Sequence, residues 1–243
     1  MKTKLLLGLL IVVIIGVTIW WKFGKNTQLL TTNPATIPLQ EENSQQKDID
    51  AIRSFMGKPN LELSFIKIDL PTPYFRVGKI TKVGNGENMD AVDAWTRNVN
   101  IYDQKELISG ECSVYEFNTD ARNHNLTAVI IQGLRQNEIE TLKNSGAPCI
   151  FNPKNIRKLT KTQAETIAMD YLKRILPNLE QIKDQFVYST QNNGESHEWL
   201  WQDKNYKLPD GLSSRPYPGP IIRISIYGNN QIQYWNTTSL FEN

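Results

Sequence analysis

The sequence predicts an α+β protein: an N-terminal transmembrane helix is followed by two units that each combine a helix with an antiparallel sheet. Three observations indicate this fold class. An uncharged apolar run opens the chain, two amphipathic helical patterns follow it, and each leads into short segments of alternating apolar and polar residues. Helices and strands that occur in separate runs, without strict alternation, are typical of α+β folds.

The apolar run extends from Leu5 to Trp21 and has lysines on both sides. A helix of this length spans roughly 26 Å, slightly less than a bilayer core, and aromatic residues at its end extend it at the interface. A cleaved signal peptide is the alternative, but residues 19–23 offer no small-residue cleavage site. We therefore expect residues 1–25 to form a cytoplasmic stub and an uncleaved signal anchor, in a single-pass membrane protein whose bulk is extracytoplasmic.

Composition bounds the next segment and the class of partner. Residues 26–47 are rich in Thr, Asn, Gln and Pro without a regular apolar period, which favours a flexible stalk. Of the 27 basic residues four flank the anchor, which leaves 23 against 25 acidic residues. That balance lacks the basic surface that nucleic acids attract, so we expect the membrane, and no nucleic acid, as a partner.

The clearest helix extends from Leu159 to Pro177, where apolar residues recur at steps of three and four. Thr160 and Gln163 form a capping box at its start. Pro177 disfavours helical geometry in the residue before it and ends the helix. This helix opens the second unit, residues 159–243. The segments expected after it are strands 185–191 and 196–202 around a turn at 192–194, a proline-rich loop at 208–220, strand 222–226, a turn at 228–230, and strand 231–235 closing the sheet.

The first unit, residues 48–120, begins with a shorter helix over residues 49–56, which Gly57 and Pro59 end. Alternating apolar residues predict strands at 61–68, 95–102 and 113–117, with a turn at 103–105 and a returning segment at 106–109.

A connecting segment, residues 121–158, separates the two units. Apolar residues between positions 126 and 134 have helical spacing, whereas the β-branched run 127–131 favours a strand; we predict a helix. A second helix is predicted over residues 137–143, ending before Gly146.

Two short echoes indicate that the units arose by duplication. Pro59-Asn60-Leu61-Glu62 follows the first helix, as Pro177-Asn178-Leu179-Glu180 follows the second. Ile101-Tyr102-Asp103-Gln104 opens a predicted hairpin, as Ile226-Tyr227-Gly228-Asn229 does. Both echoes predict the same order of helix and strands in each unit.

The motif Thr162-Gln163-Ala164, with the helix and terminal hairpin around it, resembles a PepSY-type domain. The likeness covers residues 159–235 and, more faintly, 48–117. The turn departs from the family pattern, since Gly228-Asn229-Asn230 stands where Asp-x-x-Thr-Gly is common. The resemblance implies a non-catalytic extracytoplasmic module of the bacterial envelope, one that binds or restrains a peptidase or another envelope protein.

The residues offer little for metal or nucleophilic chemistry. His197-Glu198 begins like a zincin motif, but Trp201 stands where the second histidine is needed, and His124 is the only other histidine. We expect no metal and no cofactor. Cys112 and Cys149 suit a disulfide on the outer side of the membrane, with free thiols or a Cys149–His124 nucleophile pair as alternatives.

Aromatic residues near the proline-rich loop are the candidate binding site. An exposed aromatic surface suits a peptide or glycan strand, although tryptophans that cap the sheet under the helix are the competing interpretation. The residues of this candidate surface are Trp199, Trp201, Tyr206, Arg215 and Tyr217.

We therefore expect a membrane-anchored binding or regulatory module without catalysis. The alternative is an envelope hydrolase that uses Glu198, Asp203 or Asp210 near residues 203–220. A concave pocket lined by convergent carboxylates favours the hydrolase.

Overall fold

The computed structural model describes residues 39–69, 76–83, 86–91, 98–108, 111–146, 149–150, 158–191, 195–215 and 219–241. No helix in these ranges is long and apolar enough to cross a membrane, and the predicted anchor at residues 5–21 lies outside them. The predicted strand start at 95–97 and the turn at 192–194 also lie outside the described residues.

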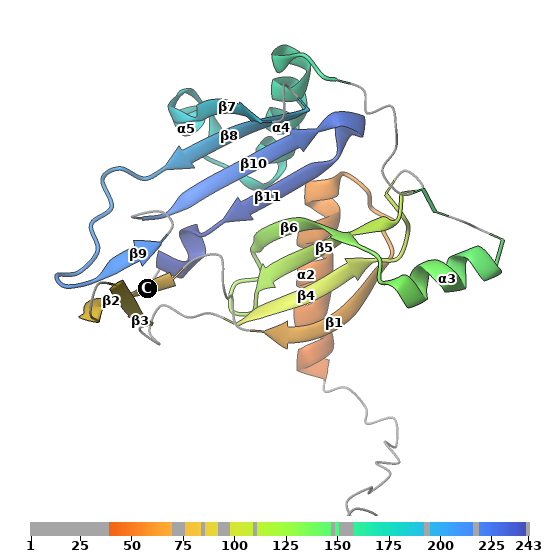
Figure 1. Cartoon of the computed structure of the whole chain (residues 1–243), viewed down its shortest axis with the longest axis horizontal. Helices are drawn as coiled ribbons and strands as arrows, with labels where there is room; N and C mark the ends of the chain where they lie inside the picture. Colours follow the sequence, from red (N-terminus) through yellow and green to blue (C-terminus); the bar gives the residue numbers. More distant parts are fainter. Residues whose placement is uncertain are drawn as a thin grey trace, which may run out of the picture. The chain divides into compact units, whose positions relative to one another are not determined.

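Eight strands form one antiparallel sheet in the order β1-β4-β5-β6-β11-β10-β8-β7 (Figure 1). Each half is a meander in chain order, and the last strands of the two meanders, β6 and β11, pair at the centre. There Val129 lies opposite Tyr234. The strands are β1 (Leu63–Asp69), β4 (Val99–Gln104), β5 (Ser113–Asp120), β6 (Leu126–Gly133), β7 (Val187–Gln191), β8 (Ser196–Gln202), β10 (Ile221–Tyr227) and β11 (Ile232–Asn236).

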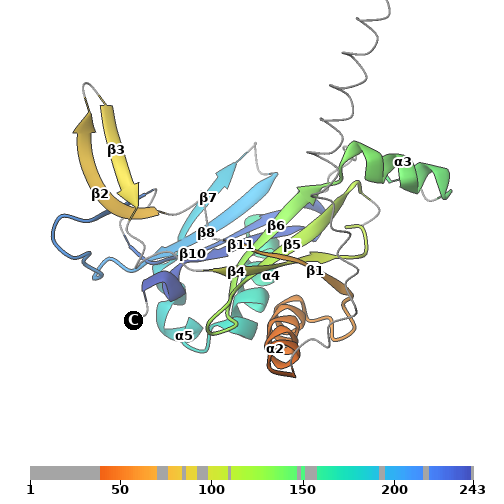
Figure 2. The same cartoon turned by 90° about the horizontal axis from the view of Figure 1, so that it is seen from below.

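The main helices lie on one side of this sheet, as Figure 2 shows for α2, α4 and α5. Their bounds are α2 (Leu39–Met56), α4 (Lys161–Ile175) and the short α5 (Leu179–Ile182), and α3 (Gln136–Asn144) has no buried residue. A smaller three-stranded sheet has the order β3-β2-β9. Its strands are β2 (Arg76–Val83), β3 (Gly86–Ala91) and β9 (Ser213–Arg215), and short 3-10 turns occupy Lys183–Gln185, Gly228–Asn230 and Thr238–Phe241.

One hydrophobic core joins both halves. Side chains at alternate positions of β10 face the helices, and Ile224 and Ile226 are fully buried there. Ile52 from α2 and Leu172 from α4 pack into the same cluster on the helix-covered face of the sheet. The predicted α+β class with antiparallel strands is therefore confirmed, and its two helix-and-sheet halves share one sheet and one core.

Helix α4 matches its sequence signals. The Thr160 hydroxyl accepts a hydrogen bond from the Gln163 backbone N–H at 3.3 Å, while the Gln163 side-chain oxygen accepts one from the Thr160 N–H at 3.0 Å. This is the predicted capping box, which satisfies two amides at the helix start. Ala164, Ala168 and Leu172 line the buried face.

Helix α2 is longer than predicted, because it begins at Leu39 inside the segment expected to be a stalk. Its first turns are polar and carry no apolar stripe, so periodicity alone gave no signal there. Its end matches the prediction: Gly57 has a φ of +64°, and the Gly57 and Lys58 N–H groups bond to the carbonyls of Ser54 and Arg53. This is a Schellman ending, in which glycine takes the left-handed position.

Residues 126–133 form strand β6, so the predicted helix over 126–134 is wrong. The β-branched run decided the outcome, since β6 pairs with β5 on one side and β11 on the other, and Leu126 and Val129 are buried. The predicted helix at 137–143 is confirmed as α3. Two boundaries also differ: β4 continues to Gln104 through the expected turn, and β9 lies within the proline-rich loop.

The two echoes have different outcomes. Leu61 and Leu179, each in a Pro-Asn-Leu-Glu segment, are both buried in the shared core after their helices. Each motif of the second echo ends the first strand of an antiparallel pair, β4–β5 or β10–β11, as predicted. The two positions are not equivalent, because Tyr102 lies on the second strand of its meander and Tyr227 on the third. Tyr102 faces the core, whereas Tyr227 is half-buried and bonds to Gln233 on the other face. Duplication of the units stays a prediction.

The C-terminal end of α2 is held by a cation from α4. Arg174 Nη1 donates a hydrogen bond to the Phe55 carbonyl oxygen at 2.9 Å, and the guanidinium also lies 5.0 Å from the ring centre of Tyr171. A cation at this position complements the negative end of the α2 dipole and satisfies a carbonyl that has no partner within the helix.

Substitution of Gly57 with alanine tests this junction. A Cβ at Gly57 would lie 2.5 Å from Arg174 Nη1, and the positive φ adds backbone strain. We expect Gly57→Ala to lower the free energy of unfolding by about 1–3 kcal/mol, measured by denaturant titration. Gly133→Ala is the matched control, since no atom lies within 4 Å of its added Cβ. Equal stabilities for the two variants would contradict the proposed role of the junction.

Candidate functional site

The predicted aromatic residues that the structure describes do not form one exposed surface. Trp199 is only 2% exposed and packs in the core beside Tyr188, so the prediction that it faces a partner is wrong, and the competing core interpretation holds. Its position on β8 points it toward α4, because it shares a face with the buried Ile224. Tyr206 packs against Phe241 at the C-terminal turn, with 4.7 Å between the ring centres.

The remaining predicted residues differ in how far the structure describes them. Trp201 is half-buried and its indole N–H donates to the Gln185 side-chain oxygen at 3.1 Å. Arg215 belongs to β9, where only its backbone is described, and Tyr217 lies outside the described residues. Trp201 also lines a cavity between the C-terminal ends of α2 and α4.

Glu198, Asp203 and Asp210, the carboxylates of the hydrolase alternative, are not among the residues that line the cavity between α2 and α4. Glu198 pairs with Arg223 at 2.5 Å on the sheet face opposite the helices. Asp203 accepts a hydrogen bond from the Asn205 backbone at 2.9 Å, as an ordinary loop aspartate does, and Asp210 is exposed. The described structure therefore holds no convergent set of these three groups in the cavity.

The cavity itself lies between the C-terminal ends of α2 and α4, above the centre of the sheet. Its volume is about 780 Å³, within the range of small-molecule sites in proteins. Ala51 and Ser54 of α2 form one wall, and residues 174–178 at the end of α4 form the other. The apolar lining residues are Leu126, Ile175, Leu176, Pro177, Ile182, Trp201 and Ile222.

The Tyr234 hydroxyl is the unusual polar group of the lining. Tyr234 is 0% exposed, and no described group reaches hydrogen-bond geometry with its hydroxyl. Burial raises the pKa of this hydroxyl well above its usual value, and the Asn236 side chain, which interacts with the hydroxyl, lowers it. A buried donor without an acceptor costs free energy, so an acceptor placed in the cavity would recover it.

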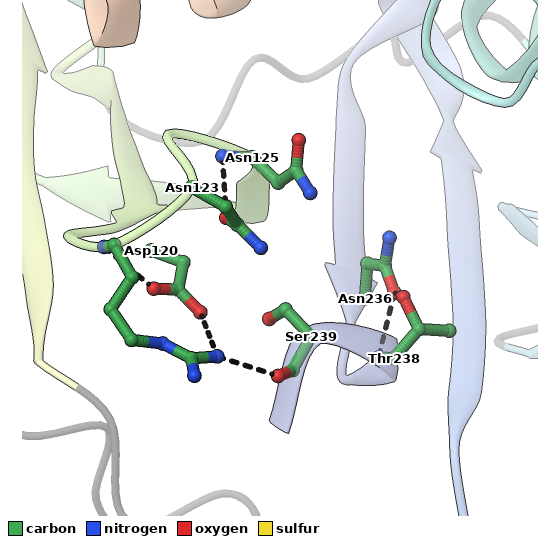
Figure 3. A network of polar contacts seen from close by, with 7 residues as sticks. Asp120, Asn123, Asn125, Asn236, Thr238 and Ser239 are labelled. Atoms are coloured by element: carbon green, nitrogen blue, oxygen red, sulfur yellow. Dashed lines mark hydrogen bonds and ion pairs between the residues drawn. The ribbon is translucent and has the colours of Figure 1, made fainter. Parts of the chain in front are cut away.

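One end of the cavity is fixed by a polar network between the β5–β6 turn and the C-terminal segment (Figure 3). Arg122 donates to the Ser239 carbonyl at 3.1 Å and pairs with the buried Asp120 at 3.4 Å. Asn236 accepts hydrogen bonds from the backbone and hydroxyl of Thr238 at 2.9 and 2.7 Å, so its oxygen is engaged. Asn125 and Asn236 both line this end of the cavity.

Arg174 is the charged residue of the lining, and its charge is partly balanced. It pairs with the exposed Asp170 one turn earlier in α4 and bonds to the Phe55 carbonyl. No carboxylate is among the described residues that line the cavity. The electrostatic character of the site is therefore neutral to positive.

A second polar cluster lies around Asp48, on the buried face of α2. Asp48 is fully buried and accepts hydrogen bonds from the Asn100 amide at 2.7 Å and the Tyr102 hydroxyl at 2.8 Å. His124 Nδ1 lies 2.9 Å from its other oxygen, which accepts the N–H. Burial and the bond to Asp48 raise the pKa of Tyr102 well above its usual value. The cluster anchors α2 to β4 and to the β5–β6 turn, and sequence reasoning missed it.

The other predicted chemical groups are engaged in structure. His197 Nε2 donates to the Leu159 carbonyl at 2.9 Å, and Nδ1 lies 2.9 Å from the Tyr188 hydroxyl, so both ring nitrogens have partners. Cys112 and Cys149 form a disulfide, so Cys149 is no free nucleophile for a pair with His124. On the loop-entropy model a bridge across 37 residues contributes about 3–4 kcal/mol.

No protein-family model matches the chain, and searches of curated proteins and of solved structures gave no match either.

A sequence signal for the missed residues exists in part. Asp48 has the spacing of the buried face, since Ile52 and Phe55 follow it at steps of four and three. A carboxylate on an apolar stripe predicts a buried polar partner. Tyr234 gave no such signal, because an aromatic residue on an alternating strand is ordinary core.

Replacing Asp48 tests the buried cluster. Asp48→Ala leaves the donors of Asn100, Tyr102 and His124 without their acceptor, so we expect a loss of about 3 kcal/mol in unfolding free energy. Asp50→Ala, on an exposed position of the same helix, is the control and should change stability by less than about 0.5 kcal/mol. Chemical denaturation measures both, and a neutral Asp48→Ala variant would refute the anchoring role.

Proposed function

We propose that this chain is a non-catalytic binding module, held outside a membrane by residues 1–25, and that its ligand occupies the cavity between α2 and α4. The observation that carries the site is the Tyr234 side chain, which lines the cavity and whose buried hydroxyl has no hydrogen-bond partner among the described residues. The anchor and the side of the membrane rest on the sequence alone, on the apolar run from Leu5 to Trp21.

The composition of the lining supports binding over catalysis. General acid–base or nucleophilic chemistry uses a histidine, carboxylate, thiol or lysine, or a hydroxyl that an adjacent base activates. The described lining contains no histidine, carboxylate, thiol or lysine, so its hydroxyls have no such base within the lining; it offers amides, hydroxyls and one guanidinium. Such groups orient a ligand in a cleft that also has apolar walls, as binding sites commonly do.

The PepSY-type resemblance adds a partner to this proposal. It rests on the motif Thr162-Gln163-Ala164, which forms the first turn of α4. On this proposal the module restrains a peptidase or another envelope protein, and occupancy of the cavity is the input to which it responds.

The first test is whether a small molecule co-purifies with the full chain from its native membrane. The full chain is extracted in lipid nanodiscs, the bound molecules are released with organic solvent, and mass spectrometry quantifies them against empty nanodiscs. We expect one class of molecule at near-stoichiometric amount. Ala51→Phe projects a ring from α2 into the cavity and should remove it.

Asp50→Phe is the control, since it adds the same ring at an exposed position of the same helix outside the lining. It should retain the molecule. Equal retention by both folded variants, or the absence of any molecule above the nanodisc background, would refute the proposed site.

A further inference from the structure

We infer that the ligand is an amphiphile with one apolar chain and a carboxylate head, such as a medium-chain fatty acid. This inference rests on the proposed function and specifies the chemistry of the same cavity. Three features of the lining lead to it: its apolar walls, its unpartnered donor and its charge.

The apolar residues of the lining favour a ligand that has an apolar chain. Ile175, Leu176 and Ile182 line the α4–α5 side, while Leu126, Trp201 and Ile222 come from the sheet. Ile222 is 3% exposed and Leu176 is 9% exposed, so part of the lining is already removed from water. Filling the space with an alkyl chain gains dispersion contacts and releases water from the remaining apolar surface.

The polar groups select an acceptor for the head. The Tyr234 hydroxyl is a donor without an acceptor in a fully buried position. The oxygen of Asn236 already accepts two hydrogen bonds from Thr238, and the Asn236 side chain also interacts with the Tyr234 hydroxyl. A carboxylate accepts from several donors at once, and hydrogen bonds to a charged acceptor are stronger than neutral ones.

The charge of the lining selects against a cationic head. Arg174 is the charged residue among those that line the cavity, and no carboxylate is present in the described lining to pair with an ammonium group. A carboxylate head meets attraction from Arg174, whereas a quaternary ammonium head meets repulsion and leaves the Tyr234 donor unsatisfied. Head chemistry therefore distinguishes this inference from simple apolar filling.

Photo-crosslinking of the full chain in lipid nanodiscs tests the inference. One probe is decanoic acid with a diazirine in its chain, and the other has the same chain with a trimethylammonium head. Mass spectrometry maps the labelled residues. We expect the acid to label the peptides that contain Leu126, Ile175–Ile182 or Trp201, and the ammonium probe to label them about ten-fold less.

Two variants complete the test. Tyr234→Phe keeps the ring and removes the donor, so it should fold normally and reduce labelling by the acid about ten-fold. Tyr227→Phe removes a hydroxyl on the opposite sheet face, where it bonds to Gln233 at 2.8 Å, and should leave labelling unchanged. Thermal unfolding of both variants checks that they are folded.

The outcomes separate this inference from the proposed function. Equal labelling of the cavity by both probes, or an unchanged signal in folded Tyr234→Phe, overturns the carboxylate head while the cavity remains a binding site. Labelling by neither probe overturns the amphiphile, and if no molecule co-purifies either, the proposed function fails with it.

Discussion

The contact between the end of α2 and α4 is the constraint on which the shared core depends. Phe55 is fully buried. The centre of its ring lies 5.1 Å from the ring centre of Tyr171 in α4 and 5.2 Å from that of Tyr234 in β11. Arg174 closes the same junction by bonding to the Phe55 carbonyl. One residue of the first half therefore touches both the helix and the central strand of the second half.

The cavity is a consequence of this arrangement. Both helices approach each other near their C-terminal ends, and these ends carry the irregular backbone of a Schellman turn and of Pro177. Side chains from such ends do not interdigitate as two regular helix faces do. Tyr234 and Ile222 line the space that remains.

The two halves have equivalent helices with different polar content. Asp48, Ile52 and Met56 in α2 have the spacing of Ala164, Ala168 and Leu172 in α4, and all six are buried. Small residues let α4 lie close to the sheet. The carboxylate of α2 instead requires Asn100, Tyr102 and His124, a set of partners that specifies how this helix sits on its strands.

The sequence predicted the elements with a clear period and missed those set by long-range pairing. Helix α4, its capping box and the alternation of β10 follow from local chemistry, and the structure confirms them. Strand β6 was assigned as a helix because its spacing suits both structures, and only pairing with β5 and β11 decides between them. Hairpin β2–β3 and its pairing with β9 carry no strong apolar alternation, so they gave no signal.

The candidate site was predicted less well than the fold. Trp199 and Trp201 lie on one face of β8, but the core covers Trp199, since its burial depends on which helix packs over that face. The cavity joins residues of α2, α4 and β11 that are far apart in the chain, and no local pattern indicates such a meeting. A buried hydroxyl without a partner becomes visible only when all its neighbours are in place.

Because one core and the β6–β11 pairing join both halves, we expect them to unfold as one unit. Native-state hydrogen exchange of the full chain, followed by mass spectrometry over a series of denaturant concentrations, measures it most directly. The structure predicts the same opening free energy for amides in β5, β6, β11 and β10, and the same denaturant dependence. Exchange of β5 and β6 at markedly lower free energy than β10 and β11 would show two independent units and contradict the shared core.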